Sequence, residues 1–227
     1  MIWALVMAGG KGKRLWPLST ERKPKPFLKL LPGQATLLEE TLKRLSSIVG
    51  RKRIWIIGSE PHLGALRKCA SGVPRNQIVG EPVSRNTAAT VGLGAYWIFQ
   101  RDPKATLLVL PADHWIGNRK KFKEAIRLAI RNSERTQSFS IVGTKPTFPS
   151  SGYGYLQSGK KVSSSVYELR RFVEKPSREV AAGLVAWGPE GSVDLRGLAN
   201  QYAWGGYAQP SEAGVLMVLG AGCVGLR

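Results

Sequence analysis

Five short segments of the chain combine residue types that can do chemistry on phosphates. The first is the glycine-rich, basic segment Ala8–Leu15, which directly follows an apolar run. Glycines let backbone N–H groups approach a phosphate closely, and Lys and Arg add positive charge. The segment is not a Walker loop, because the G-x-x-x-x-G-K-[ST] spacing is absent, and it is not a dinucleotide-binding fingerprint, because Leu15 stands where the third glycine would be. Taken alone, this segment fits a plain turn as well as a phosphate site.

Two further segments place polar residues on a restricted backbone. In Arg22–Phe27, two prolines fix the chain around Lys25 and are expected to direct this side chain inward. The alternative is a solvated basic turn. The segment Glu81–Ala89 runs from an expected strand into an expected helix, whose amino terminus would favour an anion or a polar ligand. Ordinary helix capping by Ser84 or Asn86 accounts for the same pattern.

The last two segments carry carboxylates after apolar runs. Asp113, in Leu110–His114, follows the most apolar run of the chain and is well placed to hold Mg²⁺, which prefers oxygen ligands and binds beside substrate phosphates. An aspartate that caps a turn is the competing interpretation. In Phe172–Pro176, alternation along a strand would turn Glu174 into a site that Lys175 closes, and a surface ion pair is the alternative.

These segments follow or join alternating apolar and amphipathic stretches. The expected strands are 2–8, 53–58, 77–79, 106–110 and 139–142. Between them, 36–48 and 120–131 have apolar residues at helical spacing, and 85–99 indicates a buried helix rich in Ala and Gly. Strands that alternate with helices predict an α/β fold with a mostly parallel sheet and helices on both faces. Ligands of such sheets bind beyond the carboxyl ends of the strands.

The charge balance points to an anionic partner. The 227 residues contain 34 Lys and Arg against 15 Asp and Glu, a formal net charge of +19. Nucleic acid, a membrane surface or a phosphorylated small molecule would each match this excess. Two distant cysteines and two histidines exclude a disulfide framework, a cysteine zinc site and a multi-histidine metal site. We expect a reduced, cytoplasmic protein without a signal peptide or a membrane span.

The composition of the chain and its pattern of apolar residues change twice towards the carboxyl end. From residue 151 the expected strands, 153–157 and 167–174, are more polar and suit an antiparallel extension. Residues 181–227 contain ten glycines against five charged residues, and 215–219 is their compact apolar run. A natural glycine-rich terminus is one interpretation. A frameshifted or truncated gene end is the one we favour, so we expect a domain over 1–180 and an anomalous tail over 181–227.

Together the five segments resemble the sugar-phosphate nucleotidyltransferases, in the branch that joins guanine nucleotides to mannose. The resemblance covers roughly residues 1–180. It rests on Ala8-Gly9-Gly10-x-Gly12-x-Arg14-Leu15-Trp16-Pro17-Leu18-Ser19, Lys25-Pro26-Phe27-Leu28-Lys29-Leu30, Glu81-Pro82 with Arg85-Asn86-Thr87-Ala88-Ala89, Leu110-Pro111-Ala112-Asp113-His114 and Phe172-Val173-Glu174-Lys175-Pro176. It implies a Rossmann-like nucleotidyltransferase fold and the transfer of a guanylyl group from GTP to mannose 1-phosphate, giving GDP-mannose and pyrophosphate.

The resemblance also implies roles for particular residues. Arg14, Lys25 and Asp113 would be catalytic, with Asp113 holding Mg²⁺ as the cofactor. The nucleotide would be bound by Gly9, Gly10, Gly12, Glu81, Asn86, Thr87 and Ala88. The mannose 1-phosphate would be bound by Gly152, Glu174 and Lys175. A homo-oligomer is compatible with this assignment, whereas a membrane or a specific nucleic acid is not expected as a partner.

The carboxyl-terminal part departs from the family pattern. No Asn-Ser-Gly-type sugar contact follows Lys175, Asn200 precedes Gln-Tyr, and Asp194 lies in a glycine-rich stretch instead of the family's second metal-binding context. One carboxylate would hold the metal weakly. Loss of the later strands would expose a sheet edge. We therefore expect the fold to be incomplete at its carboxyl end and the activity to be impaired.

Three alternatives stay open on the sequence. The first is a nucleotidyltransferase for another sugar 1-phosphate or nucleotide, since a few pocket contacts set specificity. The second is a non-functional remnant that keeps the motifs. The third is a basic nucleic-acid-binding protein, although the cationic residues are scattered and no recognised binding module is present.

Overall fold

The structure is a computed structural model of the chain. It describes residues 1–9, 15–30, 35–83, 86–144, 146, 148–152, 154–163, 165–186 and 216–219, with backbone only for 86, 186 and 216–219. The chain forms two units, which are described separately below. The first unit contains Met1–Trp115, Leu128–Ser140 and Leu216–Arg227, and the second contains Ile116–Arg127 and Ile141–Val215.

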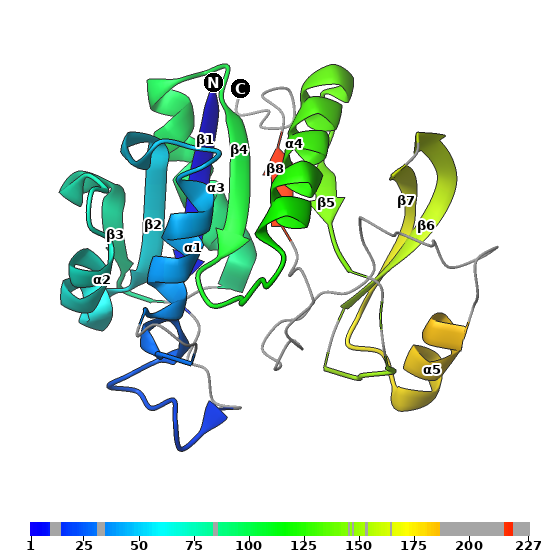
Figure 1. The fold of residues 1–227 in the computed structure, drawn as a ribbon, viewed down its shortest axis with the longest axis horizontal. Helices are drawn as coiled ribbons and strands as arrows, with labels where there is room; N and C mark the ends of the chain where they lie inside the picture. The colour runs from blue at the N-terminus through cyan, green and yellow to red at the C-terminus, as the bar shows by residue number, and fades with distance from the viewer. Residues whose placement is uncertain are drawn as a thin grey trace. The chain divides into compact units, whose positions relative to one another are not determined.

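Four parallel strands form the centre of the first unit. They are β1 (Ile2–Ala8), β2 (Ile54–Ser59), β3 (Ile78–Glu81) and β4 (Thr106–Pro111). Their order is β3-β2-β1-β4, so the first strand lies between β2 and β4 (Figure 1). Because all four run the same way, their carboxyl ends meet at one edge of the sheet. The predicted α/β class with a mostly parallel sheet is confirmed.

The helices that connect these strands are α1 (Leu37–Leu45), α2 (Leu63–Cys69) and α3 (Asn86–Arg101). Helices α1 and α3 lie on opposite faces of the sheet (Figure 1), and α4 (Arg119–Thr136) follows β4. Short 3-10 turns occur at Lys25–Phe27, Arg51–Arg53, Glu60–His62 and Arg75–Gln77. Thr36 begins α1 with a capping box, in which its hydroxyl accepts from the Glu39 N–H and the Glu39 carboxylate accepts from the Thr36 N–H.

The core explains why the strands are apolar throughout. Alternate residues of a strand point to opposite faces, and in β1 both sets are buried. Trp3 and Leu5 belong to a cluster that includes Ala95 and Ile98 of α3. The opposite face contacts other helices: a Cβ on Gly58 of β2 would lie only 2.7 Å from the side chain of Leu66 in α2.

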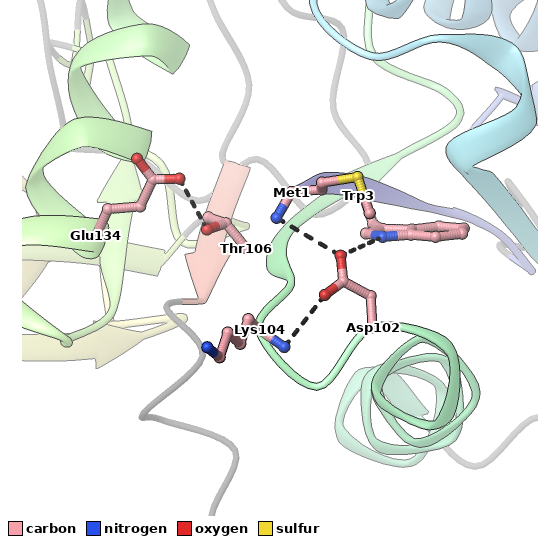
Figure 2. Close-up of polar contacts among 6 residues, drawn as sticks. All are labelled: Met1, Trp3, Asp102, Lys104, Thr106 and Glu134. Carbon is pink, nitrogen blue, oxygen red and sulfur yellow. Dashed lines mark hydrogen bonds and ion pairs between the residues drawn. The ribbon is translucent and has the colours of Figure 1, made fainter.

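The amino end of the sheet is closed by polar contacts, shown in Figure 2. The Asp102 carboxylate accepts a hydrogen bond from Trp3 Nε1 at 3.1 Å and forms an ion pair with the amino group of Met1 at 3.5 Å. At the start of β4, the Thr106 hydroxyl donates to the Glu134 carboxylate at 3.0 Å. These contacts lie at the edge opposite to the segments singled out by sequence.

One antiparallel strand extends this sheet. Strand β8 (Leu216–Leu219) pairs with β4, with Leu108 opposite Val218. It precedes β5 (Ser140–Val142) in the order of the sheet. The sequence led us to expect that loss of later strands would expose a sheet edge, which stays a prediction; β4 itself is paired with β8, which comes from the apolar run noted at 215–219.

The second unit is built on a hairpin and a helix. Strands β6 (Gly154–Ser163) and β7 (Val166–Glu174) pair antiparallel, with irregular register beyond Gln157. The antiparallel pairing agrees with the sequence, but the two strands form a sheet of their own and do not extend the parallel sheet. Helix α5 (Arg178–Ala186) follows. Its Ala181 is fully buried and packs with Tyr155 of β6, and this pair is the buried centre of a small apolar cluster.

One helix was missed and one local expectation was wrong. Helix α2 was not predicted from the sequence, because only Leu66 of this short helix is buried and it shows no apolar stripe. The sequence predicted that α3 is buried, whereas Leu93 and Tyr96 are exposed. Within the described residues, no helix is long and apolar enough to cross a membrane.

Candidate active site

The candidate site lies at the carboxyl edge of the parallel sheet. Gly9 follows β1, Glu81 ends β3, and Asp113 comes two residues after β4. Since these strands are parallel, the three residues lie at the same edge. This is the edge at which open α/β sheets bind their ligands.

Lys25 is directed inward and forms an ion pair with Asp113. Its Nζ lies 3.2 Å from Asp113 Oδ2, and the two side chains are 10% and 22% exposed. Pro24 and Pro26 flank it in the 3-10 turn, where the Phe27 N–H donates to the Pro24 carbonyl. The prolines thus fix the backbone from which Lys25 projects, as the sequence led us to expect. A solvated basic turn does not describe Lys25.

Helix α1 holds the segment that carries Asp113. The Thr41 hydroxyl donates to the Ala112 carbonyl at 3.2 Å, and Arg44 Nη2 donates to the His114 carbonyl at 2.8 Å. Arg44 Nη2 also donates to the Thr41 hydroxyl at 2.8 Å. Thr41 and Arg44 are both buried. The backbone on each side of Asp113 is therefore fixed by one helix.

Glu81 is held by α3 and faces the start of the glycine-rich segment. Its Oε1 accepts a hydrogen bond of 2.6 Å from the Thr90 hydroxyl, and both side chains are buried. A Cβ placed on Gly9 would lie 4.0 Å from Glu81 Oε2. The carboxylate thus lies close to the backbone at the end of β1.

Three described candidates, Gly152, Glu174 and Lys175, lie in the second unit. Glu174 and Lys175 form an ion pair of 3.2 Å with side chains 42% and 54% exposed, which is the surface pair considered as the alternative. Lys175 has a φ of +47°, so the chain bends sharply at the end of β7. The Gly152 N–H donates to the Ser150 hydroxyl, and Ser150 in turn exchanges two backbone hydrogen bonds with the Tyr155 hydroxyl.

Part of the predicted site lies outside the described residues. This applies to Gly10, Gly12 and Arg14, and to the side chain of Asn86. The backbone of Asn86 begins α3, and Thr87 and Ala88 belong to its first turn, half-buried and exposed respectively. Their predicted roles stay predictions.

Neither a preformed metal cluster nor an activated thiol occurs in the part of the chain that the structure describes. No group of three or more His, Cys, Asp or Glu side chains there could hold a metal ion. Burial raises the pKa of the Cys69 thiol, so this cysteine stays protonated at neutral pH and is a poor nucleophile. The chemistry of the described site is thus that of a buried cation, a paired carboxylate and a second buried carboxylate.

A comparison of the sequence with protein-family models finds one family that matches most of the chain. Residues 3–209 match the nucleotidyl transferase family, and the chain belongs to that family. The match extends into the glycine-rich segment after residue 180. The predicted boundary between a domain and an anomalous tail stays a prediction.

The particular relatives are named for one activity. Mannose-1-phosphate guanylyltransferases from Escherichia coli and Sinorhizobium fredii are 39% and 41% identical over 198 and 186 residues. These matches cover 83% and 81% of this chain, but only 40% and 36% of the relatives, so the chain spans well under half their length.

Solved structures agree on the fold. A Thermus thermophilus structure described as a mannose-1-phosphate geranyltransferase has a TM-score of 0.76 at 34% identity and covers 95% of this chain and 56% of its own. A Helicobacter pylori structure described as a mannose-6-phosphate isomerase has a TM-score of 0.69 at 24% identity, which supports the fold alone.

Sequence reasoning missed Thr41, Arg44 and Thr90. None belongs to one of the five segments, and each looks like an ordinary polar residue of a helix. For α1 there was a weak signal: Thr41 and Arg44 are three apart and adjoin the apolar positions Leu38, Leu42 and Leu45. Polar residues on the edge of an apolar stripe can reach a neighbouring backbone.

Proposed function

We propose that the protein containing this chain transfers a guanylyl group from GTP to mannose 1-phosphate, forming GDP-mannose and pyrophosphate. The names of the relatives support this pair of substrates. The structural observation that supports it most is the ion pair of Lys25 and Asp113 at the carboxyl edge of the sheet. It supplies a cation for phosphate oxygens and a carboxylate for a divalent metal in the same place.

In the proposed reaction, a phosphate oxygen of mannose 1-phosphate attacks the α-phosphorus of GTP. The bond from this phosphorus to the bridging oxygen breaks, and pyrophosphate leaves with the electron pair. No covalent intermediate with the protein is needed, so the residues contribute by positioning and by neutralising charge. We assign phosphate contacts to Lys25 and stabilisation of the transition-state charge to Arg14.

We propose Mg²⁺ as the divalent cation and Asp113 as its protein ligand. Mg²⁺ usually binds through one or two carboxylates together with substrate phosphates. Asp113 fits this requirement because its carboxylate is partly exposed at the sheet edge and its partner in the structure is the Lys25 ammonium group, which a divalent cation could replace. When bound, the cation would neutralise charge on the nucleotide phosphates. Lys25 would then be free to donate to phosphate oxygens.

The other proposed roles follow the positions of the motifs. The backbone of Gly9, Gly10 and Gly12 would hold the nucleotide phosphates. The nucleoside would contact Glu81, Asn86, Thr87 and Ala88, and the sugar phosphate would contact Gly152, Glu174 and Lys175. The exposed pair of Glu174 and Lys175 is accessible to such a ligand.

Thermal unfolding with Mg²⁺ and each nucleoside triphosphate tests this proposal on the chain itself. A ligand at about 100 times its Kd should raise the midpoint by roughly 5–11 °C for a two-state chain of this size. We expect GTP to give this shift and ATP, UTP and dTTP to give less. Lys25→Met should reduce the GTP shift, whereas Lys52→Met, at an exposed site before β2, is the matched control.

Two results would contradict the proposal in different ways. A larger shift with another nucleotide would assign the site to a different nucleotidyltransferase. A chain that unfolds without a cooperative transition would be the remnant considered above. Turnover of GTP and mannose 1-phosphate, measured after binding is established, then tests whether the carboxyl-terminal departure impairs activity.

A further inference from the structure

The contact between Thr90 and Glu81 joins a helix to the end of a strand. The Thr90 hydroxyl lies 2.6 Å from Glu81 Oε1, and the two residues are 7% and 9% exposed. A hydrogen bond from a hydroxyl to a carboxylate is of the strong, charge-assisted kind. The contact therefore restricts where the Glu81 carboxylate can lie.

The local sequence explains how the two side chains meet. The chain leaves β3 at Glu81 and enters α3 at Asn86, so Thr90 is one turn inside the helix. Side chains of a helix lean towards its amino terminus, which brings the Thr90 hydroxyl back towards the end of β3. A threonine in a helix often bonds to its own backbone. Here the hydroxyl also reaches across the connecting segment to the Glu81 carboxylate.

The other carboxylate oxygen points to the candidate site. Oε2 of Glu81 lies 4.0 Å from the position that a Cβ on Gly9 would take. A carboxylate has about four lone-pair sites, and Thr90 occupies one on Oε1, so acceptor capacity remains on the side of Oε2. Gly9, which has no side chain, leaves this side of the carboxylate uncovered by its own atoms.

We propose that Thr90 is a positioning residue that sets base selectivity by holding Glu81 with Oε2 turned towards the nucleobase. The inference rests on the proposed function, because it assumes that a nucleotide binds at this edge of the sheet. An ionised carboxylate accepts and does not donate. It selects a base edge that presents two adjacent N–H donors.

Among the common bases, guanine has that edge, with its ring N1–H next to its exocyclic amino group. Hypoxanthine keeps the ring N–H and lacks the amino group, so it offers one donor where guanine offers two. Adenine presents an acceptor at N1, and uracil and thymine flank their N–H with two carbonyl oxygens. Each acceptor placed beside a carboxylate is unfavourable, and a buried site has no water to relieve it.

The test compares Thr90→Val with Thr90→Ser by equilibrium binding of GTP, ITP and ATP without divalent metal. Valine keeps the size of threonine and removes the hydroxyl, whereas serine keeps the donor. We expect Thr90→Val to weaken GTP binding by about tenfold, the usual scale for a hydrogen bond to a charged group. The binding of ITP should weaken less, so the preference for GTP over ITP should fall. Thr90→Ser should bind both nucleotides about as the original chain does.

Thr106→Val provides a matched control. Thr106 is also buried and also donates to a glutamate, Glu134, at 3.0 Å, but it lies at the opposite edge of the sheet (Figure 2). Both valine variants remove one Thr–Glu hydrogen bond and should lower the unfolding midpoint by similar amounts. Only Thr90→Val should change the ratio of the GTP and ITP dissociation constants.

The possible outcomes distinguish a failure of the role proposed for Thr90 from a failure of the proposed function. If the original chain does not prefer GTP, the proposed function and the role of Thr90 are both overturned. If the original chain prefers GTP and Thr90→Val keeps that preference, only the role of Thr90 is overturned. An equal loss of affinity in Thr90→Val and Thr106→Val would show a general effect on stability and would also overturn it.

Discussion

Two lysine–carboxylate pairs in this chain have the same separation and very different surroundings. Lys25 Nζ and Asp113 Oδ2 lie 3.2 Å apart, and so do Lys175 Nζ and Glu174 Oε1. The first pair joins segments distant in sequence and is largely buried, whereas the second joins neighbours and is about half exposed. Distance alone therefore does not tell what an ion pair contributes.

The support around each pair makes the difference. Asp113 lies between two carbonyls that α1 holds through Thr41 and Arg44. The exposed pair lies at the end of β7, next to a small cluster whose buried residues are Tyr155 of β6 and Ala181 of α5. Water screens charges in the second region and is largely excluded in the first. We therefore expect substitutions to have strong, coupled effects in the first region and weak, independent effects in the second.

The largest effect is expected from Arg44→Met. The substitution removes buried charged hydrogen bonds to the Thr41 hydroxyl and the His114 carbonyl, which should lower the free energy of unfolding by about 2–4 kcal/mol. Denaturant unfolding measures this loss. Arg170→Met, at an exposed position of β7, is the control and should change little. A loss of similar size in both variants would remove the distinction between the two regions.

An intermediate effect is expected from a double-mutant cycle on the buried pair. Lys25→Met leaves Asp113 partly buried without its cation, and we expect Lys25→Met and Asp113→Asn to be coupled by about 1–3 kcal/mol.

The same cycle on Lys175→Met and Glu174→Gln should give a coupling below about 0.5 kcal/mol. Unfolding at low and high salt checks both cycles, because screening should weaken only the exposed pair. Equal couplings in the two cycles would contradict the comparison.

The smallest effect is expected at Glu179, at the start of α5. Hydrogen bonds from its own backbone N–H and from the Ser177 hydroxyl lower the pKa of this exposed carboxyl below its ordinary value of 4.5. A lowered pKa means that the ionised form favours the folded state above that ordinary value and loses this advantage as the pH falls through the lowered pKa. Glu179→Gln should therefore be slightly less stable near neutral pH and match the original chain in acid. Unfolding midpoints of the two chains, measured from neutral to acid pH, test this prediction. It is contradicted if the difference between the midpoints grows as the pH falls.

Much of the fold could be predicted because segments with buried faces carry apolar residues in a recognisable pattern. Strand β1 has its predicted bounds since both of its faces are covered, and α4 follows its apolar spacing. Helix α2 left no such trace because it buries one leucine. The exposure of Leu93 in α3 was missed because composition does not tell which side of a helix is covered.

The site was predictable residue by residue but not as a set of contacts. The prolines around Lys25 indicated its direction, and the position of Asp113 after a strand indicated its edge of the sheet. Their ion pair depends on how the chain returns to the sheet, which no local pattern encodes. The same holds for the hydrogen bonds of Arg44 and Thr90.

Strand β8 has a consequence for how the chain folds during synthesis. Leu107, Leu108 and Val109 of β4 pair with residues 219, 218 and 217, and the two strands are separated by more than a hundred residues. At the usual speed of translation, the ribosome needs on the order of ten seconds to make that interval. During this time one side of β4 offers unsatisfied backbone groups to any other extended chain. Aggregation of the nascent protein should therefore depend on how quickly translation reaches residue 219.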